Sequence, residues 1–484
     1  MSTTKTEYDV DICVIGAGSA GLSMTAGAAM LDRNVLLFEG AEMGGDCLNH
    51  GCVPSKAILK AGKIAQSHRS GEAFGIKPSE PEVDWEAVKA HVKDVIETIA
   101  PVDSVERFEG LGATVITEYA KFVDANTVES ETTRVRAKRF VIAVGSRASA
   151  PPIPGLDKVD YATNENIFSL ETFPEHLIVI GAGPIGLEMG QTFHRLGAKV
   201  TIIDIATPLS QNEPEHAKAL VEAVAAEGVT FHAPANTKEV RQTKSGIEVE
   251  LETGTIVKGS HLLVAAGRAP AVDGLNLESA GITYDRRGID VDGNLRTSNK
   301  KVYAAGDVAK GMGGLTHIAG FHAGSLFKNF FMLPQGLNKG FSTAVTDRMP
   351  AAVYTEPELA NIGLTEAAAR EKYGDVVKAV EFHFDENDRG IAERSTKGGV
   401  KIIVGKKGKI LGGSIVGAHA GEMIHMLSVA MTGKMKLSAL AQIISPYPTR
   451  SEAVKRAASS AFTESLFGPK SAVRKTANFW AKFQ

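Results

Sequence analysis

The stretch that decides the fold reads Tyr8-Asp-Val-Asp-Ile-Cys-Val-Ile-Gly-Ala-Gly-Ser-Ala-Gly21. Its first eight residues predict a buried parallel strand. In the glycines that follow, Gly16 permits a tight turn, Gly18 lets the backbone approach a pyrophosphate, and Gly21 allows the next helix to pack on the strand. The sequence therefore predicts a dinucleotide-binding loop that comprises Gly16, Gly18, Ser19, Ala20 and Gly21.

The residues after this loop complete a strand–helix–strand unit. A helix of small residues is predicted from Leu22 to Leu31, and a second strand from Val35 to Phe38, which ends at Glu39. The start of the helix would bind phosphates, and Glu39, about twenty residues after the loop, would accept a hydrogen bond from a ribose hydroxyl. Cys13, inside the first strand, is predicted to be a small core residue. A glycine motif alone is weak evidence, but the complete unit is strong evidence for a dinucleotide site.

The same pattern occurs again near the middle of the chain. A strand at 177–180 precedes a second glycine loop, a helix spans 187–196, and a strand at 199–203 ends at Asp204. An acidic residue there hydrogen-bonds a ribose 2′-hydroxyl and repels a 2′-phosphate, and no basic residue follows Asp204 in the next four positions. We therefore expect two dinucleotides, one held permanently and one exchanged, with NADH preferred to NADPH. The loop residues predicted to bind the second dinucleotide are Gly181, Gly183, Ile185 and Gly186.

Two cysteines lie between these units, in Gly44-Gly-Asp-Cys47-Leu-Asn-His-Gly-Cys52-Val-Pro-Ser-Lys56. In a regular helix their Cα atoms would be roughly 8 Å apart, whereas a disulfide tolerates about 4.4–6.8 Å. If Cys47 and Cys52 form a bridge, the first helical turn must therefore be distorted; Gly51 permits unusual dihedral angles and Pro54 is tolerated there. A thiol near a helix N-terminus also has its thiolate favoured. Two unrelated buried cysteines are the alternative, which the chain's total of three cysteines disfavours.

This stretch resembles, nearly letter for letter, the redox-active site of the flavin-dependent pyridine nucleotide–disulfide oxidoreductases. That family includes dihydrolipoamide dehydrogenase, glutathione reductase and mercuric reductase, and the resemblance spans almost the whole chain. It implies FAD at the first loop, NADH at the second, and electron flow from nicotinamide through the flavin to a Cys47–Cys52 disulfide. It also implies that Cys52 is the thiolate beside the flavin and that Cys47 attacks the acceptor. Lys56 would pair with Glu188 near the flavin.

The resemblance assigns further residues to cofactor binding. Val302-Tyr-Ala-Ala-Gly306-Asp307-Val308 resembles the family's second FAD motif, in which Asp307 would bond the ribityl chain of the flavin. Two other predicted strands end at Gly145 and Gly267. The additional cofactor-binding residues implied in this way are Gly45, Asp46, Lys56, Gly145, Gly267, Arg268, Gly306 and Asp307.

The fold class expected is α/β, with two Rossmann-like nucleotide-binding domains plus an α+β dimerisation domain like that of glutathione reductase. We expect residues 1–155 and 280–345 to form the FAD-binding domain and residues 156–279 the NAD(P)H-binding domain. Residues 346–484 would form the dimerisation domain with a C-terminal extension, because strands at 399–404 and 410–416 read as an antiparallel sheet. The resemblance implies a homodimer.

One position departs from the family. Disulfide reductases of this family carry His-x-His-Pro-Thr-x-x-Glu near the C-terminus, and the second histidine reaches across the dimer as the acid–base partner of the exposed thiol. Here Tyr447 stands in place of that histidine, whereas Glu452 remains. A tyrosine with a pKa near 10 donates a proton but is a poor base, and loss of such a group costs about 10²–10⁴ in rate. We therefore expect weak turnover of dihydrolipoamide or glutathione.

Three hypotheses follow for the acceptor. The chain is a dihydrolipoamide dehydrogenase-like enzyme acting on a small-molecule disulfide, a mercuric reductase-like metal or quinone reductase, or a redox-sensing partner without turnover. Mercuric reductases carry tyrosine in this region, but they also use a C-terminal cysteine pair, and no cysteine follows Cys52 here. His50 is a weaker candidate for the missing base.

Composition limits the remaining possibilities. A formal net charge of −3 argues against a nucleic-acid partner. The sequence has no run of eighteen apolar residues and no apolar signal segment near its start, so we expect the cytoplasm. No resident metal is expected, since His383, Asp385, Glu386 and Asp388 read as a polar loop. The basic residues at 134–139 are interpreted as the solvent face of an edge strand.

The tail after residue 464 is basic and aromatic. Val473, Ala477, Trp480 and Ala481 fall on one helical face. Packing of this face on the chain's own dimerisation domain is the simpler interpretation, and docking to an anionic membrane surface or a membrane partner is the alternative.

Overall fold

The computed structural model of the chain describes residues 5–332, 344 and 347–483. Residues 1–4 of the N-terminal segment and the predicted domain boundary at 345–346 lie outside the described residues. The chain divides into two units. The first comprises Met1–Gly181, Thr192–Lys199 and Thr237–Thr346, and the second comprises Ala182–Gln191, Val200–Asn236 and Asp347–Gln484.

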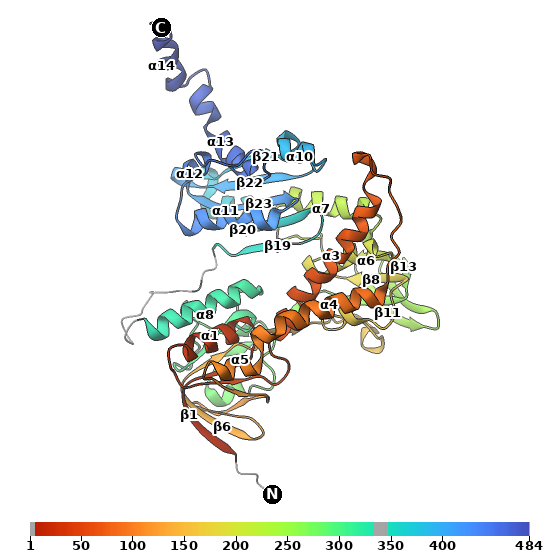
Figure 1. The fold of residues 1–484 in the computed structure, drawn as a ribbon, viewed down its shortest axis with the longest axis vertical. Helices are drawn as coiled ribbons and strands as arrows, with labels where there is room; N and C mark the ends of the chain where they lie inside the picture. Colours follow the sequence, from red (N-terminus) through yellow and green to blue (C-terminus); the bar gives the residue numbers. More distant parts are fainter. Residues whose placement is uncertain (1–4, 333–343, 345–346, 484) are drawn as a thin grey trace. The chain divides into compact units, whose positions relative to one another are not determined.

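The first unit is built on a seven-stranded sheet around β1 (Thr6–Ile15) (Figure 1). Parallel strands β2 and β6 lie on either side of β1, and β18 pairs in parallel with β6. The order β3-β2-β1-β6-β5-β4 is formed by β2 (Val35–Phe38), β3 (Thr114–Ile116), β4 (Lys121–Asp124), β5 (Thr127–Glu129) and β6 (Thr133–Ile142), with β18 at Val302–Ala304. The carboxyl ends of β1, β2, β6 and β18 meet at one edge, where parallel sheets bind ligands.

The predicted elements of this sheet are largely confirmed. The observed β2 has the predicted bounds, and β1 begins two residues before the predicted strand. Cys13 is buried in the core as expected. One interpretation was wrong: β6, which carries Arg134 and Arg136, is an interior strand, because β1 pairs along one side of it and β5 and β18 along the other. The basic side chains still alternate with buried residues, so only the edge position was misjudged.

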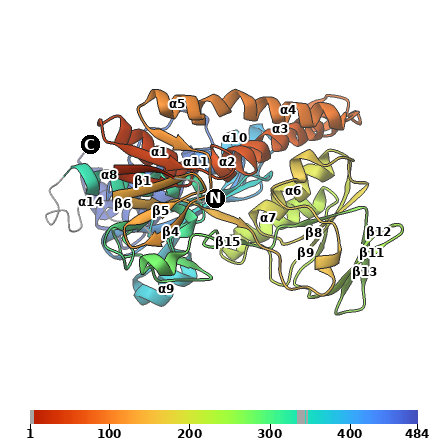
Figure 2. The same cartoon turned by 90° about the horizontal axis from the view of Figure 1, so that it is seen from below.

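Helices cover this sheet. Helix α1 (Ser19–Ala29) lies beside α8 (Thr316–Phe331) (Figure 1), and both begin close to the carboxyl edge of the sheet. Next in the chain come α2 (Gly45–Asn49), α3 (Cys52–Arg69), α4 (Trp85–Ile99) and α5 (Val105–Gly110). Figure 2 shows α3 and α4 running side by side. Asp84 caps α4 by accepting a hydrogen bond from the backbone N–H of Ala87 at 3.1 Å.

The first unit also contains smaller strand groups. Strand β8 (His176–Ile180) pairs in parallel with β14 (His261–Val264). A three-stranded antiparallel sheet is formed by β11 (Thr237–Thr243), β12 (Gly246–Leu251) and β13 (Ile256–Gly259). Two-stranded ribbons are formed by β7 (Ser146–Ala148) with β15 (Arg268–Pro270) and by β16 (Tyr284–Asp285) with β17 (Gly288–Ile289). The β7–β15 ribbon thus holds residues 146–148 beside residues 268–270, and both segments contribute side chains to the candidate site described below.

The second unit is built on a five-stranded antiparallel sheet of order β19-β20-β23-β22-β21. Its strands are β19 (Pro350–Val353), β20 (Glu358–Gly363), β21 (Lys378–His383), β22 (Gly399–Val404) and β23 (Ile410–Gly417). The helices are α9 (Glu366–Tyr373), α10 (Asp388–Ala392), α11 (Ala420–Thr432), α12 (Leu437–Ala441), α13 (Glu452–Phe467) and α14 (Ala472–Trp480). The antiparallel sheet predicted for this region is confirmed.

The middle of the chain contributes further elements. Strand β9 (Lys199–Ile203) pairs in parallel with β10 (Thr230–His232), and the helices are α6 (Pro184–Arg195) and α7 (Pro214–Ala226). In the second unit, α7 is tied to the antiparallel sheet by the buried Lys401 of β22, whose ammonium lies 3.0 Å from Glu213, 2.5 Å from Glu215 and 2.8 Å from Glu366. Among the described residues, no helix is long and apolar enough to cross a membrane.

Candidate active site

The two cysteines lie at a break between helices. Cys47 belongs to α2 and Cys52 is the first residue of α3, with His50 (φ −136°) and Gly51 (φ −125°, ψ −110°) in non-helical conformations between them. A Cβ atom on Gly51 would lie 2.9 Å from the backbone oxygen of Asp46. The helix is interrupted between the two cysteines, as a bridge between them would require. Both cysteines are free thiols in this structure, and their sulfurs form a hydrogen bond with each other.

The surroundings of the two thiols shift their pKa values in opposite directions. The pKa of Cys52 is lowered to about 6, chiefly by the hydrogen bond with Cys47, while partial burial opposes the change. The hydroxyl of Thr316, 3.3 Å from the Cys52 sulfur, and the positive charge of Lys56 lower it further. The pKa of Cys47 is raised by the same hydrogen bond and by burial. Cys52 is therefore a thiolate at neutral pH and Cys47 a thiol.

Two helix N-termini converge on Cys52. It is the first residue of the 18-residue α3, and Thr316 is the first residue of the 16-residue α8. The positive end of each helix dipole favours a thiolate. Sequence reasoning missed Thr316, because it lies 264 positions from Cys52 and only the folded chain brings the two together.

A chain of polar contacts runs from the cysteines to the second FAD motif. The Arg268 guanidinium lies 3.1 Å from Asp46 and donates from Nε to Ser146 Oγ at 2.8 Å. Ser146 Oγ in turn donates to Asp307 Oδ2 at 2.6 Å. The β7–β15 ribbon therefore places Arg268 among the residues predicted for FAD. Sequence reasoning missed Ser146, although it directly follows the predicted Gly145.

The first glycine loop has the space that a diphosphate needs. Gly16 has φ +102°, and a Cβ atom there would lie 2.6 Å from Ala143 O. A Cβ atom on Gly21 would lie 1.8 Å from Gly16 O, whereas one on Gly18 would meet nothing within 4 Å. Gly45 packs against this loop, since a Cβ atom there would lie 2.9 Å from the Gly18 Cα. The roles predicted for the three loop glycines agree with these distances.

The acidic residue after β2 is already oriented. Glu39 accepts hydrogen bonds from the backbone N–H of Ala17 at 2.7 Å and of Ala41 at 2.8 Å, one at each carboxylate oxygen. Each oxygen retains a lone pair for a ribose hydroxyl. Ser19 and Ala20 lie in the first turn of α1, whose N-cap residue Gly18 has no side chain to occupy the helix N-terminus.

The second loop repeats this local geometry. Gly181 has φ +114°, and its Cβ atom would lie 2.4 Å from Ala265 O, whereas a Cβ atom on Gly183 would meet nothing within 4 Å. Asp204 accepts from the backbone N–H of Ala182 at 2.5 Å and of Ala206 at 2.7 Å. Ile185 and Gly186 follow in the first turn of α6. This loop can therefore hold a second dinucleotide in the same manner.

Other predicted residues occupy suitable conformations. Gly145 (φ +69°), Gly267 (φ +150°) and Gly306 (φ +74°) all have positive φ angles, which glycine adopts without strain. Lys56 donates to Ser55 Oγ at 3.3 Å in the first unit, and Glu188 accepts from the Tyr354 N–H at 2.9 Å in the second. The Lys56–Glu188 pairing stays a prediction.

A buried histidine supports the second FAD motif. His322 of α8 is completely buried, and its Nδ1 accepts the backbone N–H of Gly306 at 3.1 Å. Burial lowers its pKa, although Asp307 acts in the opposite direction. A neutral ring with its proton on Nε2 satisfies this contact, so His322 fixes the turn that carries Asp307. Nothing in its local sequence marked this role.

Tyr447, the residue that departs from the family motif, belongs to a hydrogen-bonded cluster in the second unit. The exposed Tyr447 donates its hydroxyl proton to Asp388 Oδ2 at 2.6 Å, and this hydrogen bond raises the pKa of the phenol. Asn387 holds the neighbouring turn by donating to Thr449 O at 3.2 Å. The negative charge of Glu452, the first residue of α13, also raises the pKa of Tyr447. The cluster therefore keeps the phenol protonated.

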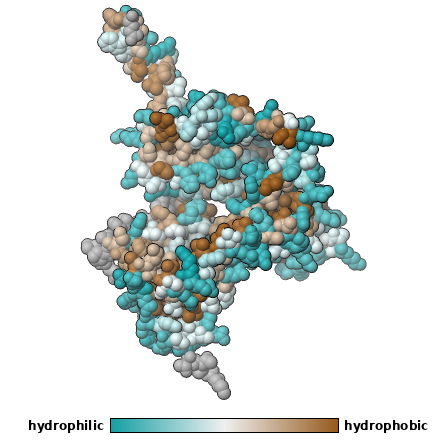
Figure 3. Space-filling view, in the orientation of Figure 1, coloured by the Kyte–Doolittle hydropathy of each residue, from teal (hydrophilic) through white to brown (hydrophobic). Residues whose placement is uncertain are grey.

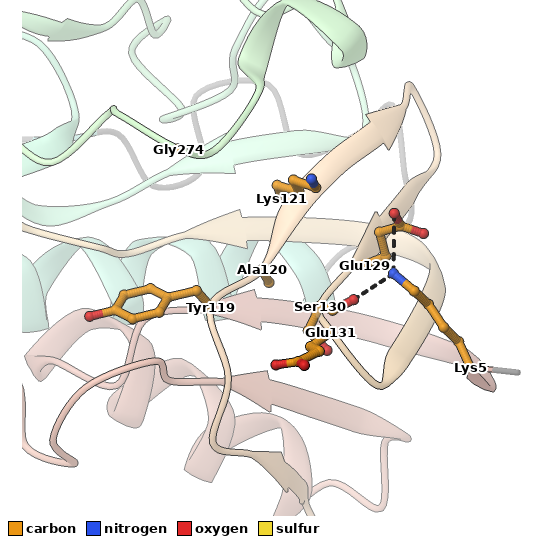
Figure 4. Close-up of a pocket in the computed structure, with 8 residues that line it drawn as sticks. All are labelled: Lys5, Tyr119, Ala120, Lys121, Glu129, Ser130, Glu131 and Gly274. Carbon is orange, nitrogen blue, oxygen red and sulfur yellow. Dashed lines mark hydrogen bonds and ion pairs between the residues drawn. The ribbon is translucent and has the colours of Figure 1, made fainter. Parts of the chain in front are cut away.

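Other polar groupings are weaker candidates. Figure 4 shows a hollow beside β4 and β5 whose lining includes Lys5, Tyr119 and Glu129. Lys5 lies 3.2 Å from Glu129 and donates to Ser130 O at 2.6 Å, so its charge is already paired.

Within the described part of the chain, no group of three or more His, Cys, Asp or Glu side chains is placed to hold a metal ion. His50 lies 3.3 Å from Glu42.

Comparison with known proteins identifies the family. The family described as pyridine nucleotide-disulphide oxidoreductase matches residues 10–323, and the dimerisation domain of that family matches residues 349–458. The chain belongs to the pyridine nucleotide–disulphide oxidoreductases. The predicted fold class, two nucleotide-binding domains plus a dimerisation domain, is thereby confirmed. The enzyme is FAD-dependent and homodimeric.

Its relatives include two kinds of enzyme. Mercuric reductase from Bacillus cereus is 34% identical over 456 residues, which cover 93% of this chain and 71% of that protein. Dihydrolipoyl dehydrogenase from Bacillus subtilis is 32% identical over 457 residues, which cover 92% of this chain and 97% of that protein. The chain is thus similar to mercuric reductases and to dihydrolipoyl dehydrogenases at nearly equal identity.

Solved structures share the fold. The HOCl-induced flavoprotein disulfide reductase RclA from Escherichia coli superimposes with a TM-score of 0.81 at 25% identity, covering 93% of this chain and 99% of that one. LpdA from Mycobacterium tuberculosis gives a TM-score of 0.83 at 24% identity, covering 93% and 100%. The latter similarity supports the fold alone.

The residues of the first unit fit the flavin that this family requires. The open space above Gly18, the two free acceptor positions of Glu39 and the Ser146–Asp307 hydrogen bond all lie at the carboxyl edge of one sheet. In that order, these features are suited to the diphosphate, the adenosine ribose and the ribityl chain of FAD.

Proposed function

We propose that this oxidoreductase passes electrons from NADH, through bound FAD, to the Cys47–Cys52 pair, and from there to an external disulfide. Bound FAD would supply the two-electron chemistry between the nicotinamide and the cysteine pair. The single observation that carries the proposal is the placement of Cys47 and Cys52 at the break between α2 and α3, with the Cys52 sulfur 3.3 Å from the Thr316 hydroxyl at the start of α8.

The residues would act in sequence on the acceptor. Cys47, once deprotonated, attacks one sulfur of the acceptor disulfide, forms a mixed disulfide and releases the first thiolate. Cys52 then attacks the Cys47 sulfur, closes the Cys47–Cys52 bridge and releases the second thiolate. The two electrons that reopen the bridge come from NADH. Lys56 and Glu188 are proposed as a pair at the flavin, as the family resemblance implies.

We propose NADH as the preferred nicotinamide cofactor. Asp204 already accepts two backbone N–H groups, which hold its carboxylate just after β9, and an acidic residue at this position of the fold hydrogen-bonds a ribose 2′-hydroxyl. A 2′-phosphate there would meet a fixed negative charge. Comparison of kcat/KM for NADH and NADPH tests the point, and a higher value with NADPH would show that Asp204 does not select the cofactor.

Tyr447 favours a second candidate acceptor, a thiophilic metal ion. Mercuric reductases are among the relatives, and RclA has been solved as a Cu(II) complex. We propose that Tyr447 and Glu452 of the partner subunit line the mouth beside Cys47. A protonated phenol there supplies a proton donor but no base, and metal reduction has less need for a base than disulfide interchange has. A quinone is a third possible acceptor of the same electrons.

An acceptor screen under anaerobic conditions tests the proposal. The FAD-loaded homodimer is mixed with NADH, flavin bleaching is followed, and new thiols are counted in wild type, Cys47→Ser and Cys52→Ser. We expect bleaching in all three and two additional reactive thiols in wild type alone. Flavin that does not bleach would favour the redox-sensing hypothesis and overturn the enzymatic one.

The same screen identifies the acceptor. Lipoamide, glutathione disulfide, a quinone, Hg(II) and Cu(II) are compared in wild type and Tyr447→His. Disulfide turnover that rises by about 10²-fold in Tyr447→His would show that the absent imidazole sets acceptor choice. Turnover of metal ions by wild type, unchanged by that substitution, would establish the second candidate. We expect the enzyme to act in the cytoplasm, where such disulfides are transient.

A further inference from the structure

The end of the chain forms two helices that leave the core of the second unit. The first half of α13 buries Ala453, Val454, Ala457 and Ala458. Farther along, α14 packs on α13 and buries none of its own nine residues. Figure 1 shows both helices running away from β21 and β22 toward the C-terminus. The simpler expectation, that the tail packs on the dimerisation domain, is met only by the contact of α14 with α13, and the apolar residues of α14 stay exposed.

Helix α14 has two chemically distinct sides. Successive residues are rotated by about 100° in a helix, and on this basis one side of α14 collects Arg474, Lys475 and Asn478. The opposite side collects Val473, Ala477 and Trp480, Phe479 lies at the border about 40° from Lys475, and Lys482 and Phe483 follow the end of the helix. A basic side and an apolar side on one helix are typical of helices that lie in a lipid–water interface.

The apolar side is aromatic and exposed. Phe479, Trp480 and Phe483 contact one another, with ring centroids 5.2–6.4 Å apart. Their exposed fractions are 54%, 61% and 71%. Figure 3 shows hydrophobic residues gathered at this end of the second unit. An exposed aromatic cluster of this kind indicates an interaction site, because moving the rings out of water lowers the free energy.

Charge indicates what covers the cluster. Residues 465–484 contain Lys470, Arg474, Lys475 and Lys482 and no acidic residue, in a chain whose formal net charge is −3. Arg474 and Lys475 lie in α14 itself, and Lys470 and Lys482 lie within two residues of its ends, so the segment that exposes the aromatic rings is also basic. Basic residues contact anionic headgroups while Trp and Phe enter the boundary of the acyl chains.

We propose that α14 docks this oxidoreductase on an anionic lipid surface. The helix would lie in the plane of the interface, with the aromatic cluster inserted and the basic side toward the headgroups. One short helix binds weakly and reversibly, but the homodimer presents two copies, and binding of the second is then intramolecular. The proposal is independent of the acceptor and of the cysteine chemistry.

Vesicle co-sedimentation of the FAD-loaded homodimer tests this proposal. Phosphatidylcholine vesicles with and without phosphatidylserine are compared for wild type, a chain ending at Gly468, the pair Arg474→Glu/Lys475→Glu and the pair Trp480→Ser/Phe483→Ser. We expect wild type to bind the phosphatidylserine vesicles and to dissociate as salt rises. Each pair of substitutions should lower partitioning about ten-fold or more, since each basic residue and each buried ring contributes.

A matched control distinguishes binding through α14 from binding through basic residues elsewhere on the protein surface. Lys406→Glu/Lys407→Glu removes two exposed basic residues elsewhere in the second unit and should leave partitioning unchanged. Equal sedimentation of wild type and the chain ending at Gly468 would overturn the proposal. So would a change of oligomeric state on truncation without vesicle binding, which would assign the aromatic cluster to a second copy of the chain. NADH oxidation measured without vesicles reports separately on the proposed function.

Discussion

The loop at Gly16–Gly21 and the loop at Gly181–Gly186 share their local geometry and differ in what surrounds them. In both, the first glycine has a positive φ angle, the second faces open space, and an acidic residue accepts two backbone N–H groups. Gly45 packs over the first loop, and Ser146 with Asp307 lies at the same sheet edge. After Asp204 the chain instead exposes Ile205, with 74% of its surface accessible.

This difference shows how one motif serves two purposes. We propose that the glycines and the acidic residue let a dinucleotide bind at each loop, and that the neighbouring segments decide whether it stays. A loop covered by a second segment suits a permanent cofactor, and a loop with an exposed flank suits a cofactor that exchanges. Matched substitutions at corresponding positions of the two loops test this distinction.

The largest expected effect comes from the second glycine of each loop. A Cβ atom on Gly18 or on Gly183 meets no protein atom within 4 Å, so Gly18→Val and Gly183→Val should both fold. We expect Gly18→Val to purify without flavin and to lose activity by about 10³-fold or more, because the cofactor carries the chemistry. Gly183→Val should keep its flavin and show a KM for NADH raised by about 10–100-fold. Flavin absorbance, circular dichroism and steady-state kinetics measure these outcomes; flavin loss in both variants would contradict the comparison.

The acidic residues give the next largest effect. Asp204→Asn removes the charge that repels a 2′-phosphate, and we expect the preference for NADH over NADPH to fall by about ten-fold. Glu39→Gln, the matched change at the first loop, should weaken flavin retention and leave the NADH/NADPH ratio unchanged. Ratios of kcat/KM for the two nicotinamides decide this point. An altered ratio in Glu39→Gln would mean that the two loops do not act separately.

The thiolate beside the first loop gives a pH-dependent test. Because the pKa of Cys52 is lowered to about 6, the thiolate is present above that pH and is lost as the pH falls through it. Alkylation of the reduced enzyme by iodoacetamide should therefore show a midpoint near pH 6 that depends on Cys52. Thr316→Ala removes a hydrogen bond to the thiolate and should move the midpoint upward by roughly one pH unit. Thr316→Ser, which keeps the hydroxyl, is the control, and equal midpoints in all three proteins would exclude a role for Thr316.

The smallest effect is expected at His322. His322→Leu removes the acceptor for the Gly306 N–H and should weaken FAD binding by about 2–10-fold, which corresponds to one buried hydrogen bond. His322→Asn places a carbonyl oxygen near the position of Nδ1 and should restore most of the affinity. Flavin fluorescence on dilution measures the dissociation constant. Similar losses in both variants would indicate a packing role only.

Much of the site could be predicted because its signals are local. The turn at Gly16, the acidic residue at Glu39 and the bounds of β2, β9 and β22 all depend on residues close in sequence. Thr316 and Ser146 could not be found in this way, because their partners lie 264 and 161 positions away and only the folded chain brings them close. His322 lies 16 positions from Gly306, and no local motif marks it. The interior position of β6 was missed for the same reason.

The tail shows a further limit of local patterns. Its amphipathic pattern predicted a helix, and α14 confirms the helix. The pattern did not tell which surface the helix covers, because an apolar face on a protein core and one at a lipid interface have the same periodicity.

The Lys401 cluster has a consequence for tolerance of acid and alkali. The pKa values of Glu215 and Glu366 are lowered: burial opposes the change for Glu215, whereas for Glu366 the hydrogen bond from Lys401 is the largest cause. The pKa of Lys401 is raised, because these hydrogen bonds outweigh its burial. The contribution of the two carboxylates to stability is complete above their ordinary pKa of 4.5 and is lost as the pH falls below it. The contribution of the Lys401 ammonium is complete below its ordinary pKa of 10.5 and is lost as the pH rises above it. The junction between α7 and the antiparallel sheet therefore keeps its ionic attachment across the whole span between those limits, and only extreme pH would release it.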